Sequence, residues 1–300
     1  MRVIFMGTPD YAAMILQSLL KYHQVCALVC QEDKRAGRNM RLQMPATKKL
    51  LLERDSRIPI FQPTKLDDNF VKKLKQIPCD RIIVAAYGKI LPKSILEIAT
   101  CINLHASILP QFRGASPIQQ SILKDEKYFG VTAMKMNEGL DCGDILGFKV
   151  IRNQFQSQTE LFSKLAKMAA NLTIEYLERC DFILPLKQIE ADVSYCKKIK
   201  KEFGQVCFDD AISLVKKARA YEGWPEIYLK NGLKLKGVKM AESVSQNPAG
   251  EILYITKEQI KIGCKNGSVW IESLQAPSKK AMSAYQYLQG KRLKLGDILE

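Results

Sequence analysis

The chain has 300 residues, 47% hydrophobic and 26% charged, so it is long enough for two globular domains and lacks the composition of a disordered protein. Lys and Arg number 46 against 31 Asp and Glu, and the net charge of +15 favours an anionic partner, such as nucleic acid, a phosphorylated substrate or a membrane surface. Nine cysteines without a CxxC pair and only two histidines disfavour a metal site and fit a reducing, cytoplasmic compartment. We expect neither a secretory leader nor a membrane span.

The first predicted unit is a strand, a turn and a helix. Residues 2–6 form a short apolar run, Gly7 and Thr8 turn, and residues 11–20 carry apolar side chains at helical spacing. A second apolar strand follows at 25–30, and this alternation predicts an α/β fold with a Rossmann-like, doubly wound, mainly parallel sheet. The turn holds one glycine instead of a GxGxxG set, which disfavours a nicotinamide cofactor and a dehydrogenase.

A basic loop is predicted over residues 31–44. Six cations and no acid fall between residues 34 and 49. The cations are Lys34, Arg35, Arg38, Arg41, Lys48 and Lys49. From the residues alone a solvated loop and a phosphate-binding loop stay equally open.

Two strand ends are expected to meet at one crevice. A buried strand over 80–86 is followed by the loop 87–92, and another strand ends near residue 105. In open parallel sheets ligands bind at the carboxyl ends of the strands. The loop and the second strand end therefore predict one binding crevice.

A group of three polar residues is the strongest candidate for chemistry. Alternation over residues 102–106 sets Asn103 and His105 on one face, and a tight glycine-flanked loop brings Asp141 within reach. An amide can donate to an oxyanion, an imidazole can move a proton, and a carboxylate can orient the imidazole. Since no Ser or Cys nucleophile has a suitable histidine partner, direct transfer of an acyl group to an amine is favoured. A merely structural, hydrogen-bonded His105 is the alternative.

The second half of the chain changes character. Strands at 130–136 and 144–151 and a helix over 159–180 are expected to close the first domain. Five short strands then follow, which predicts a small OB-like β-barrel. We expect a catalytic domain at 1–188, a linker at 189–204 and a C-terminal domain at 205–300. Residues 195–300 hold 19 Lys and Arg and 11 Asp and Glu, and 19 minus 11 gives +8 for this part.

Several short motifs carry a family resemblance. They are Asn-Leu-His at 103–105, Ser-Ile-Leu-Pro at 107–110, Arg-Gly-Ala-Ser-Pro at 113–117, Gly-Leu-Asp-Cys-Gly-Asp at 139–144, Gly-Thr-Pro-Asp at 7–10, Ala-Gly-Arg at 36–38, Ala-Tyr-Gly-Lys-Ile-Leu-Pro at 86–92, Trp-Pro at 224–225 and Lys-Lys-Ala-Met-Ser at 279–283. With them the chain resembles the folate-dependent formyltransferases over nearly its whole length. Ile108 and Cys142 replace the commoner leucine and threonine of the family.

The resemblance implies 10-formyltetrahydrofolate as the formyl donor and no metal. The basic loop and the β-rich second domain further imply a tRNA acceptor, the α-amine of methionine on initiator tRNA, and hence a role in translation initiation. The residues implied are Asn103, His105 and Asp141 for catalysis, Ser107, Ile108, Leu109, Pro110, Tyr87, Gly88 and Ile90 for donor binding, and Lys34, Arg35, Arg38 and Arg41 for tRNA binding. We expect a cytoplasmic monomer. A formyltransferase for a small amine and a nucleic-acid-binding protein with a degenerate catalytic fold are the alternatives.

Overall fold

The computed structural model describes residues 1–36 and 40–300 and divides the chain into two compact units. The first unit holds Met1–Pro117, Lys127–Asn153 and Glu160–Cys196, and the second holds Ile118–Glu126, Gln154–Thr159 and Lys197–Glu300. Two short stretches that precede residue 160 therefore belong to the second unit. The domain limits expected at residues 188 and 205 stay a prediction.

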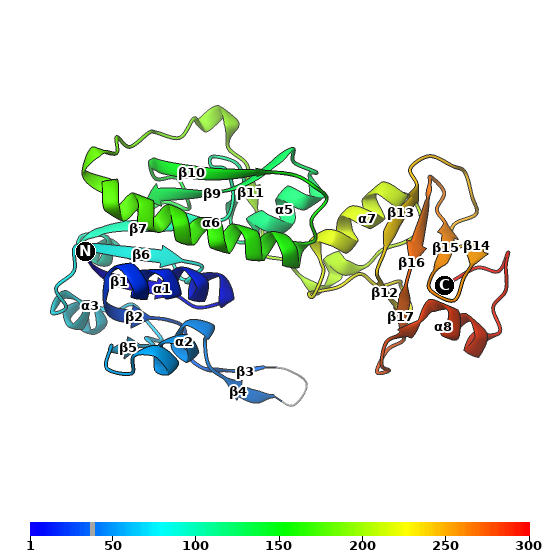
Figure 1. Cartoon of the computed structure of the whole chain (residues 1–300), viewed down its shortest axis with the longest axis horizontal. Coiled ribbons are helices and arrows are strands. Elements are labelled where there is room, and N and C mark those ends of the chain that lie inside the picture. Colours follow the sequence, from blue (N-terminus) through cyan, green and yellow to red (C-terminus); the bar gives the residue numbers. More distant parts are fainter. Residues whose placement is uncertain (37–39) are drawn as a thin grey trace. The chain divides into compact units, whose positions relative to one another are not determined.

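A seven-stranded sheet forms the centre of the first unit (Figure 1). In sheet order its strands are β10 (Ile145–Arg152), β9 (Tyr128–Lys135), β7 (Thr100–His105), β6 (Arg81–Ala85), β1 (Arg2–Gly7), β2 (Gln24–Val29) and β5 (Ile60–Phe61). The five strands from β7 to β5 run parallel, and β9 and β10 are antiparallel additions. The chain winds outward in both directions from β1, which confirms the predicted doubly wound fold and places the switch point between β1 and β6.

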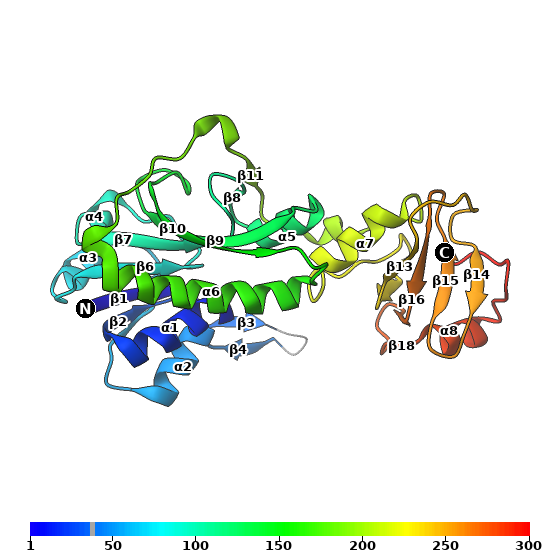
Figure 2. The ribbon, with the colours of Figure 1, turned by 45° about the horizontal axis from the view of Figure 1, so that its top comes forward.

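Helices α1 (Asp10–Tyr22) and α6 (Gln158–Arg179) lie side by side along this sheet (Figures 1 and 2). The Tyr11 and Phe162 rings meet edge to face with centroids 5.8 Å apart, and the Tyr11 hydroxyl donates to the Leu104 carbonyl at 3.4 Å. Each helix buries its apolar positions, as amphipathic spacing predicts. Three shorter helices complete the unit: α2 (Ala46–Arg54), α3 (Asp68–Lys75) and α4 (Lys93–Leu96).

Helix α3 shows how local sequence sets the elements that support the sheet. The Asp67 carboxylate accepts from the Phe70 amide at 3.0 Å and so caps the first turn. Phe70 and Leu74 then join Ile4 and Ile82 of the sheet in one buried cluster. Capping fixes where the helix starts, and the apolar stripe fixes which side it buries.

Two segments expected to be irregular contain paired strands. The basic loop includes a hairpin of β3 (Lys34–Ala36) and β4 (Arg41–Gln43), in which Arg35 pairs with Leu42. The expected linker region includes β11 (Tyr195–Cys196), which pairs parallel to β8 (Arg113–Gly114), and the short 3-10 helices η2 (Glu190–Asp192) and η3 (Lys201–Gly204). A further 3-10 helix, η1 (Cys180–Phe182), directly follows α6. These strands were not predicted, because polar segments lack the hydrophobic pattern from which strands are recognised. Their hydrogen bonds are made by backbone groups, which that pattern does not reveal.

The second unit contains the antiparallel β-structure predicted for the C-terminal domain. One sheet consists of β12 (Lys234–Lys236), β17 (Ser273–Gln275) and β18 (Met282–Ser283), and the other of β13 (Lys239–Glu242), β16 (Ser268–Ile271), β15 (Ile260–Gly263) and β14 (Ile252–Ile255). Its helices are α5 (Pro117–Leu123), α7 (Ala211–Ala220) and α8 (Ala284–Lys291). A single residue, Glu272, separates β16 from β17, so the chain passes directly from one sheet to the other.

Candidate active site

Strand β7 carries two of the predicted catalytic side chains to the carboxyl edge of the sheet. Asn103 pairs with Val84 of β6 and with Met134 of β9, and His105 pairs with Thr132. Leu104 lies between them and is buried. The period-2 geometry of the strand therefore sets the amide and the imidazole on the same face.

Asp141 comes to the same place from the loop between β9 and β10. Its carboxylate accepts from the Asn103 amide nitrogen at 3.2 Å and from the Gly114 backbone amide at 2.9 Å, and lies 3.6 Å from Nδ1 of His105. Only 13% of the Asp141 side chain is exposed, and its backbone has a φ of 48°. An L-residue in this left-handed conformation needs outside contacts to hold it there. The three side chains predicted to act together are thus in contact.

His105 is 6% exposed and both of its ring nitrogens face acceptors. Nε2 lies 2.8 Å from the Phe112 carbonyl oxygen, which can only accept, so Nε2 carries a hydrogen. In a neutral ring Nδ1 then has no hydrogen to offer the Asp141 carboxylate. One additional proton shared between the ring and the carboxylate would complete that contact, so this pair is suited to holding and passing a proton.

The segment predicted to bind the donor, residues 107–110, has a fixed backbone. The Thr132 hydroxyl donates to the Ser107 carbonyl at 2.8 Å and accepts from the Leu109 amide at 3.1 Å. The Ser107 hydroxyl donates to the Gln111 carbonyl at 2.6 Å, and the peptide bond before Pro110 is cis. Ser107 and Leu109 are buried, whereas Ile108 and Pro110 are partly exposed. Local sequence does not predict the role of Thr132, because nothing there distinguishes it from a core threonine.

The other residues predicted to bind the donor lie in the loop after β6, and they differ in how far they are exposed. Burial raises the pKa of Tyr87 to about 12, and its side chain belongs to a buried cluster with residues of the sheet, so only its backbone is left to contact a donor. The Tyr87 carbonyl accepts from the Gln31 side-chain amide at 2.9 Å. Gly88 has a φ of +79° and the Gln31 amide lies where a Cβ would stand, so a larger residue would displace it. Ile90 is 79% exposed.

The basic hairpin presents most of its cations to solvent. Lys34, Arg35 and Arg41 are exposed, with Lys34 donating to the Gln31 side-chain oxygen at 2.5 Å. Arg38, the fourth residue predicted to contact tRNA, lies outside the described residues. Lys48 differs, because it forms an ion pair with Asp33 at 2.9 Å and is largely buried.

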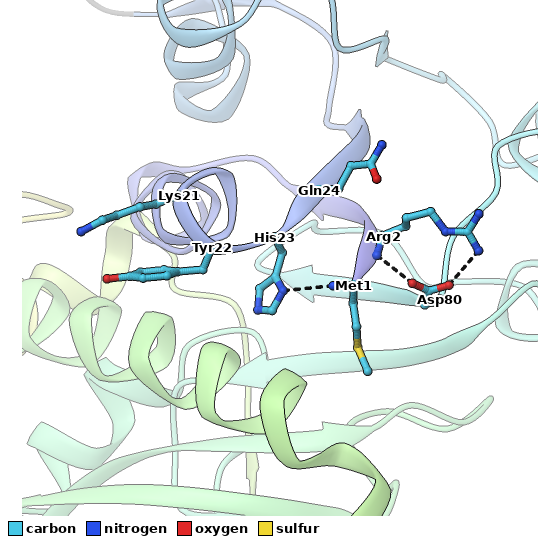
Figure 3. Close-up of a pocket in the computed structure, with 7 residues that line it drawn as sticks. All are labelled: Met1, Arg2, Lys21, Tyr22, His23, Gln24 and Asp80. Atoms are coloured by element: carbon cyan, nitrogen blue, oxygen red, sulfur yellow. Dashed lines mark hydrogen bonds and ion pairs between the residues drawn. The ribbon is translucent and has the colours of Figure 1, made fainter.

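Two surface hollows lie away from the three catalytic candidates. The first, of about 490 Å³, is lined by Met1, Arg2, Lys21, Tyr22, His23, Gln24 and Asp80 (Figure 3). It lies at the amino ends of the parallel strands, opposite to the edge that holds Asn103, and the Arg2–Asp80 ion pair of 2.9 Å occupies one wall. The second, of about 520 Å³, lies beside the end of β5 and is lined by residues between Ile60 and Lys73.

Neither a cluster of metal-ligating side chains nor a membrane-spanning helix is found in the part of the chain that the structure describes. Over residues 1–36 and 40–300 no three His, Cys, Asp or Glu side chains gather in a way that could hold a metal ion. Within the same ranges no helix is both long and apolar enough to cross a bilayer. All nine cysteines are unpaired thiols.

Comparison with known proteins decides the family. Residues 1–177 match the family described as formyl transferase, and residues 198–292 match the formyl transferase C-terminal domain. The chain belongs to the formyl transferase family. The N-terminal match contains all three clustered side chains, and the predicted resemblance is confirmed.

Full-length relatives narrow the comparison within the formyl transferases. The chain is 50% identical over 303 residues to a methionyl-tRNA formyltransferase of Sulfurimonas denitrificans, with 100% of both chains covered. It is 49% identical over 299 residues to another of Nitratiruptor sp., with 99% of both covered. The structure of HypX from Aquifex aeolicus in complex with tetrahydrofolic acid superposes with a TM-score of 0.68 at 18% identity, covering 99% of this chain and 49% of that one, which shows a shared fold.

Sequence reasoning missed a group of residues that surround the catalytic candidates. Besides Thr132 they are Phe112, Arg113, Gln188, Ser194 and Cys196. Three of them, Gln188, Ser194 and Cys196, lie in or beside the segment expected to be a linker. Only Arg113, a cation that follows a largely apolar stretch, gives a local signal, and its motif alone assigns it no role.

Proposed function

We propose that this chain transfers the formyl group of 10-formyltetrahydrofolate to the α-amine of methionine on initiator methionyl-tRNA, and so acts in translation initiation. The full-length identity of about one half to proteins named methionyl-tRNA formyltransferase carries the proposal. An amide and an imidazole that both contact one carboxylate supply the groups that formyl transfer to an amine needs.

The three side chains are assigned separate tasks. The amine nitrogen attacks the formyl carbon, and the carbonyl oxygen becomes an oxyanion. Asn103 uses one amide hydrogen on Asp141, and we assign the other to that oxyanion. The bond from the formyl carbon to N10 of the folate then breaks. One proton leaves the amine and one reaches N10, so the balance is kept when the pair of His105 and Asp141 accepts the first and returns it.

Donor and acceptor are assigned to different elements of the first unit. The backbone of residues 107–110 and of the loop 87–90 borders the carboxyl edge of the sheet, where open α/β folds bind ligands, and is assigned to the folate. The hairpin cations Lys34, Arg35 and Arg41, together with Arg38, are assigned to phosphates of the tRNA.

The domain plan and the state of the protein complete the proposal. We assign catalysis to residues 1–188, the connection to 189–204 and additional tRNA contacts to 205–300, where 15 Lys and Arg outnumber 10 Asp and Glu. The protein is proposed to work as a monomer in the cytoplasm, where charged initiator tRNA is found. Sedimentation equilibrium tests the monomer: a mass near 34.0 kDa supports it and a mass twice as large contradicts it.

A single-turnover reaction tests the function. Labelled 10-formyltetrahydrofolate is incubated with the protein and charged initiator tRNA, with free methionine and a ribonucleotide amine as parallel acceptors. We expect label on the methionyl-tRNA and none on the small amines. Transfer to a small amine but not to the tRNA would identify a formyltransferase with another acceptor. As an internal control, His105→Ala should abolish most of the transfer while the circular dichroism spectrum is unchanged.

A further inference from the structure

One segment of the first unit runs alongside the candidate active site. It contacts both the loop that carries Asp141 and residues 112–114. We call residues 186–196 the strap. At its start Leu186 and Ile145 exchange two backbone hydrogen bonds, of 2.7 and 2.9 Å, in an antiparallel bridge. In an antiparallel ladder the residue two positions further along one chain faces the residue two positions back along the other. This register carries Gln188 to Gly143, in the loop that holds Asp141.

Gln188 bonds to two backbone carbonyls of that loop. Its side-chain nitrogen donates to the Asp141 carbonyl at 2.9 Å and to the Gly143 carbonyl at 2.7 Å. Its side-chain oxygen accepts from Nε of Arg113 at 3.0 Å. Because the guanidinium can only donate and the two carbonyls can only accept, a flipped amide would face like groups at every contact. All the strong hydrogen-bonding capacity of the amide nitrogen is therefore used on the loop.

Arg113 contacts the oxygen of the Gln188 side-chain amide. Its side chain is 2% exposed, although it carries a full charge, and its guanidinium forms an ion pair with Glu190 of the strap at 2.8 Å. Burial disfavours the charged form, but the contacts with Glu190 and Tyr195 more than offset it and raise the pKa of Arg113. A buried, permanently charged fork with these partners fixes the orientation of the Gln188 amide.

The strap also supports the backbone that receives the catalytic side chains. The Phe112 amide donates to the Ser194 hydroxyl at 2.9 Å, and the Arg113 amide donates to the Ser194 carbonyl at 2.9 Å. These bonds position the Phe112 carbonyl that accepts from His105. Two residues beyond Phe112, the Gly114 amide donates to the Asp141 carboxylate, and a Cβ there would stand 2.4 Å from the Cys196 carbonyl oxygen.

We propose that Gln188, oriented by Arg113, is a positioning residue for Asp141. It acts on the backbone of the loop and leaves the carboxylate free for chemistry. Asp141 sits in a left-handed backbone conformation that L-residues rarely adopt, so its loop must be held against relaxing to a conformation that takes the carboxylate away from His105. The two hydrogen bonds from Gln188 oppose that alternative. This inference rests on the proposed function for the role of Asp141, but its geometry does not.

Gln188→Glu is the sharpest variant. It keeps the length of the side chain and an acceptor for Arg113, and it removes both donors to the loop. We expect kcat for formylation to fall on the order of 10- to 100-fold, the range that a misplacement of about 1 Å costs, while KM for the tRNA and for the donor stays within about threefold. Gln188→Ala, which removes the donors without adding a charge, should give a similar split.

Ile189→Ala is the matched control, because the neighbouring side chain is 64% exposed and projects from the same strap. It should leave kcat unchanged. Equal kcat in Gln188→Glu, Gln188→Ala and the control would overturn the inference. A loss confined to KM would overturn it as well, since binding and not the placement of Asp141 would then depend on Gln188.

Nitrogen NMR of the histidine rings reads the site without any substrate. The chain has two histidines, so His23, at the opposite edge of the sheet, serves as an internal reference for His105. We expect Gln188→Glu to shift the ring nitrogens of His105 and not those of His23, and Ile189→Ala to shift neither. Unchanged His105 signals in a folded Gln188→Glu variant would contradict the positioning role.

The wild-type protein provides a test that no folding defect can obscure. Both hydrogens of the Gln188 side-chain amide are engaged, so they should exchange with solvent more slowly than those of an exposed glutamine. Rapid exchange would overturn the inference. If the wild type instead fails to formylate tRNA while these hydrogens are protected, the proposed function fails and the structural role of Gln188 stands.

Discussion

The loop that carries Asp141 and the basic hairpin belong to the same unit, yet they are held in opposite ways. Asp141 is enclosed by hydrogen bonds from Asn103, Gly114 and Gln188, which reach it from three separate segments. The hairpin carries Arg35 and Arg41 on two three-residue strands that pair only with each other within the described residues. The loop holds a few atoms in fixed positions, whereas the hairpin presents positive charge over an exposed surface.

This difference matches the two kinds of work. Electrostatic stabilisation of a transition state needs donors and charges that are already in place, since reorganisation during the reaction raises the barrier. Phosphate contacts need only charge within reach, because many orientations of a long cationic side chain are nearly equal in energy. Substitutions in the loop should therefore change turnover sharply, whereas substitutions in the hairpin should change tRNA binding gradually.

The largest effect is expected for Asp141→Asn. The amide keeps the size but loses the charge, and one of its two polar atoms would face the Gly114 or Asn103 donors with hydrogens of its own. We expect single-turnover formylation to slow by on the order of 10²- to 10³-fold. Glu138→Gln removes an exposed carboxylate from the same loop and should leave the rate within about twofold. Similar rates for both variants would remove Asp141 from the mechanism.

Sequence alone predicted this cluster but not its enclosure. Strand alternation was enough to place Asn103 beside His105, and the glycine-flanked loop was enough to suggest Asp141. The contacts of Gln188 could not be predicted in this way, because they depend on a register set by Leu186 and Ile145 across 41 positions of sequence. The parallel order of the sheet followed from the βα alternation, whereas the hairpin within the basic loop gave no hydrophobic signal.

The buried thiols in the core of the first unit predict a loss of stability in alkali. Burial raises the pKa of the Cys30 thiol to about 11 and that of Cys101 to about 12, both from an ordinary value of 9.0. The folded state then keeps protons that the unfolded chain releases, so stability is full below pH 9 and falls as the pH rises toward 11 and 12. Each thiol should cost on the order of 2 kcal/mol by pH 11. Urea unfolding between pH 8 and pH 11 measures the loss.

Cys101→Ser sharpens the alkaline experiment. A serine hydroxyl is of similar size, does not ionise in this range and can donate to the Ala99 carbonyl, which lies 3.4 Å from the present sulfur. The slope of stability against pH should become shallower in this variant. Cys142→Ser, at a partly exposed thiol outside the core, is the control and should keep the steep slope of the wild type. An unchanged slope in Cys101→Ser would show that this thiol does not ionise on unfolding.

The double variant Arg35→Ala and Arg41→Ala tests the hairpin as a charged surface. Removing two exposed cations should raise KM for tRNA by about tenfold at physiological salt and flatten the dependence of log KM on log salt by roughly two units, one for each phosphate that is no longer neutralised. The rate at saturating tRNA should stay within about threefold. Arg57→Ala, an exposed cation paired with Asp55 outside the hairpin, is the control. A large fall in the saturated rate would place the hairpin in the catalytic step.

The smallest effect is expected for Lys34→Ala. This variant distinguishes a hairpin that acts only through its charge from one that is also coupled to the donor loop. Lys34 donates to the side chain of Gln31, and Gln31 in turn donates to the Tyr87 carbonyl in the loop assigned to the folate. If the hairpin acts through charge alone, KM for tRNA should rise only about twofold, because this ammonium already has a partner, and KM for the donor should not change. A rise in the donor KM would instead mean that Lys34 and Gln31 connect the hairpin to the donor loop. Binding of tRNA would then change the affinity for the folate, and the two regions would not act independently.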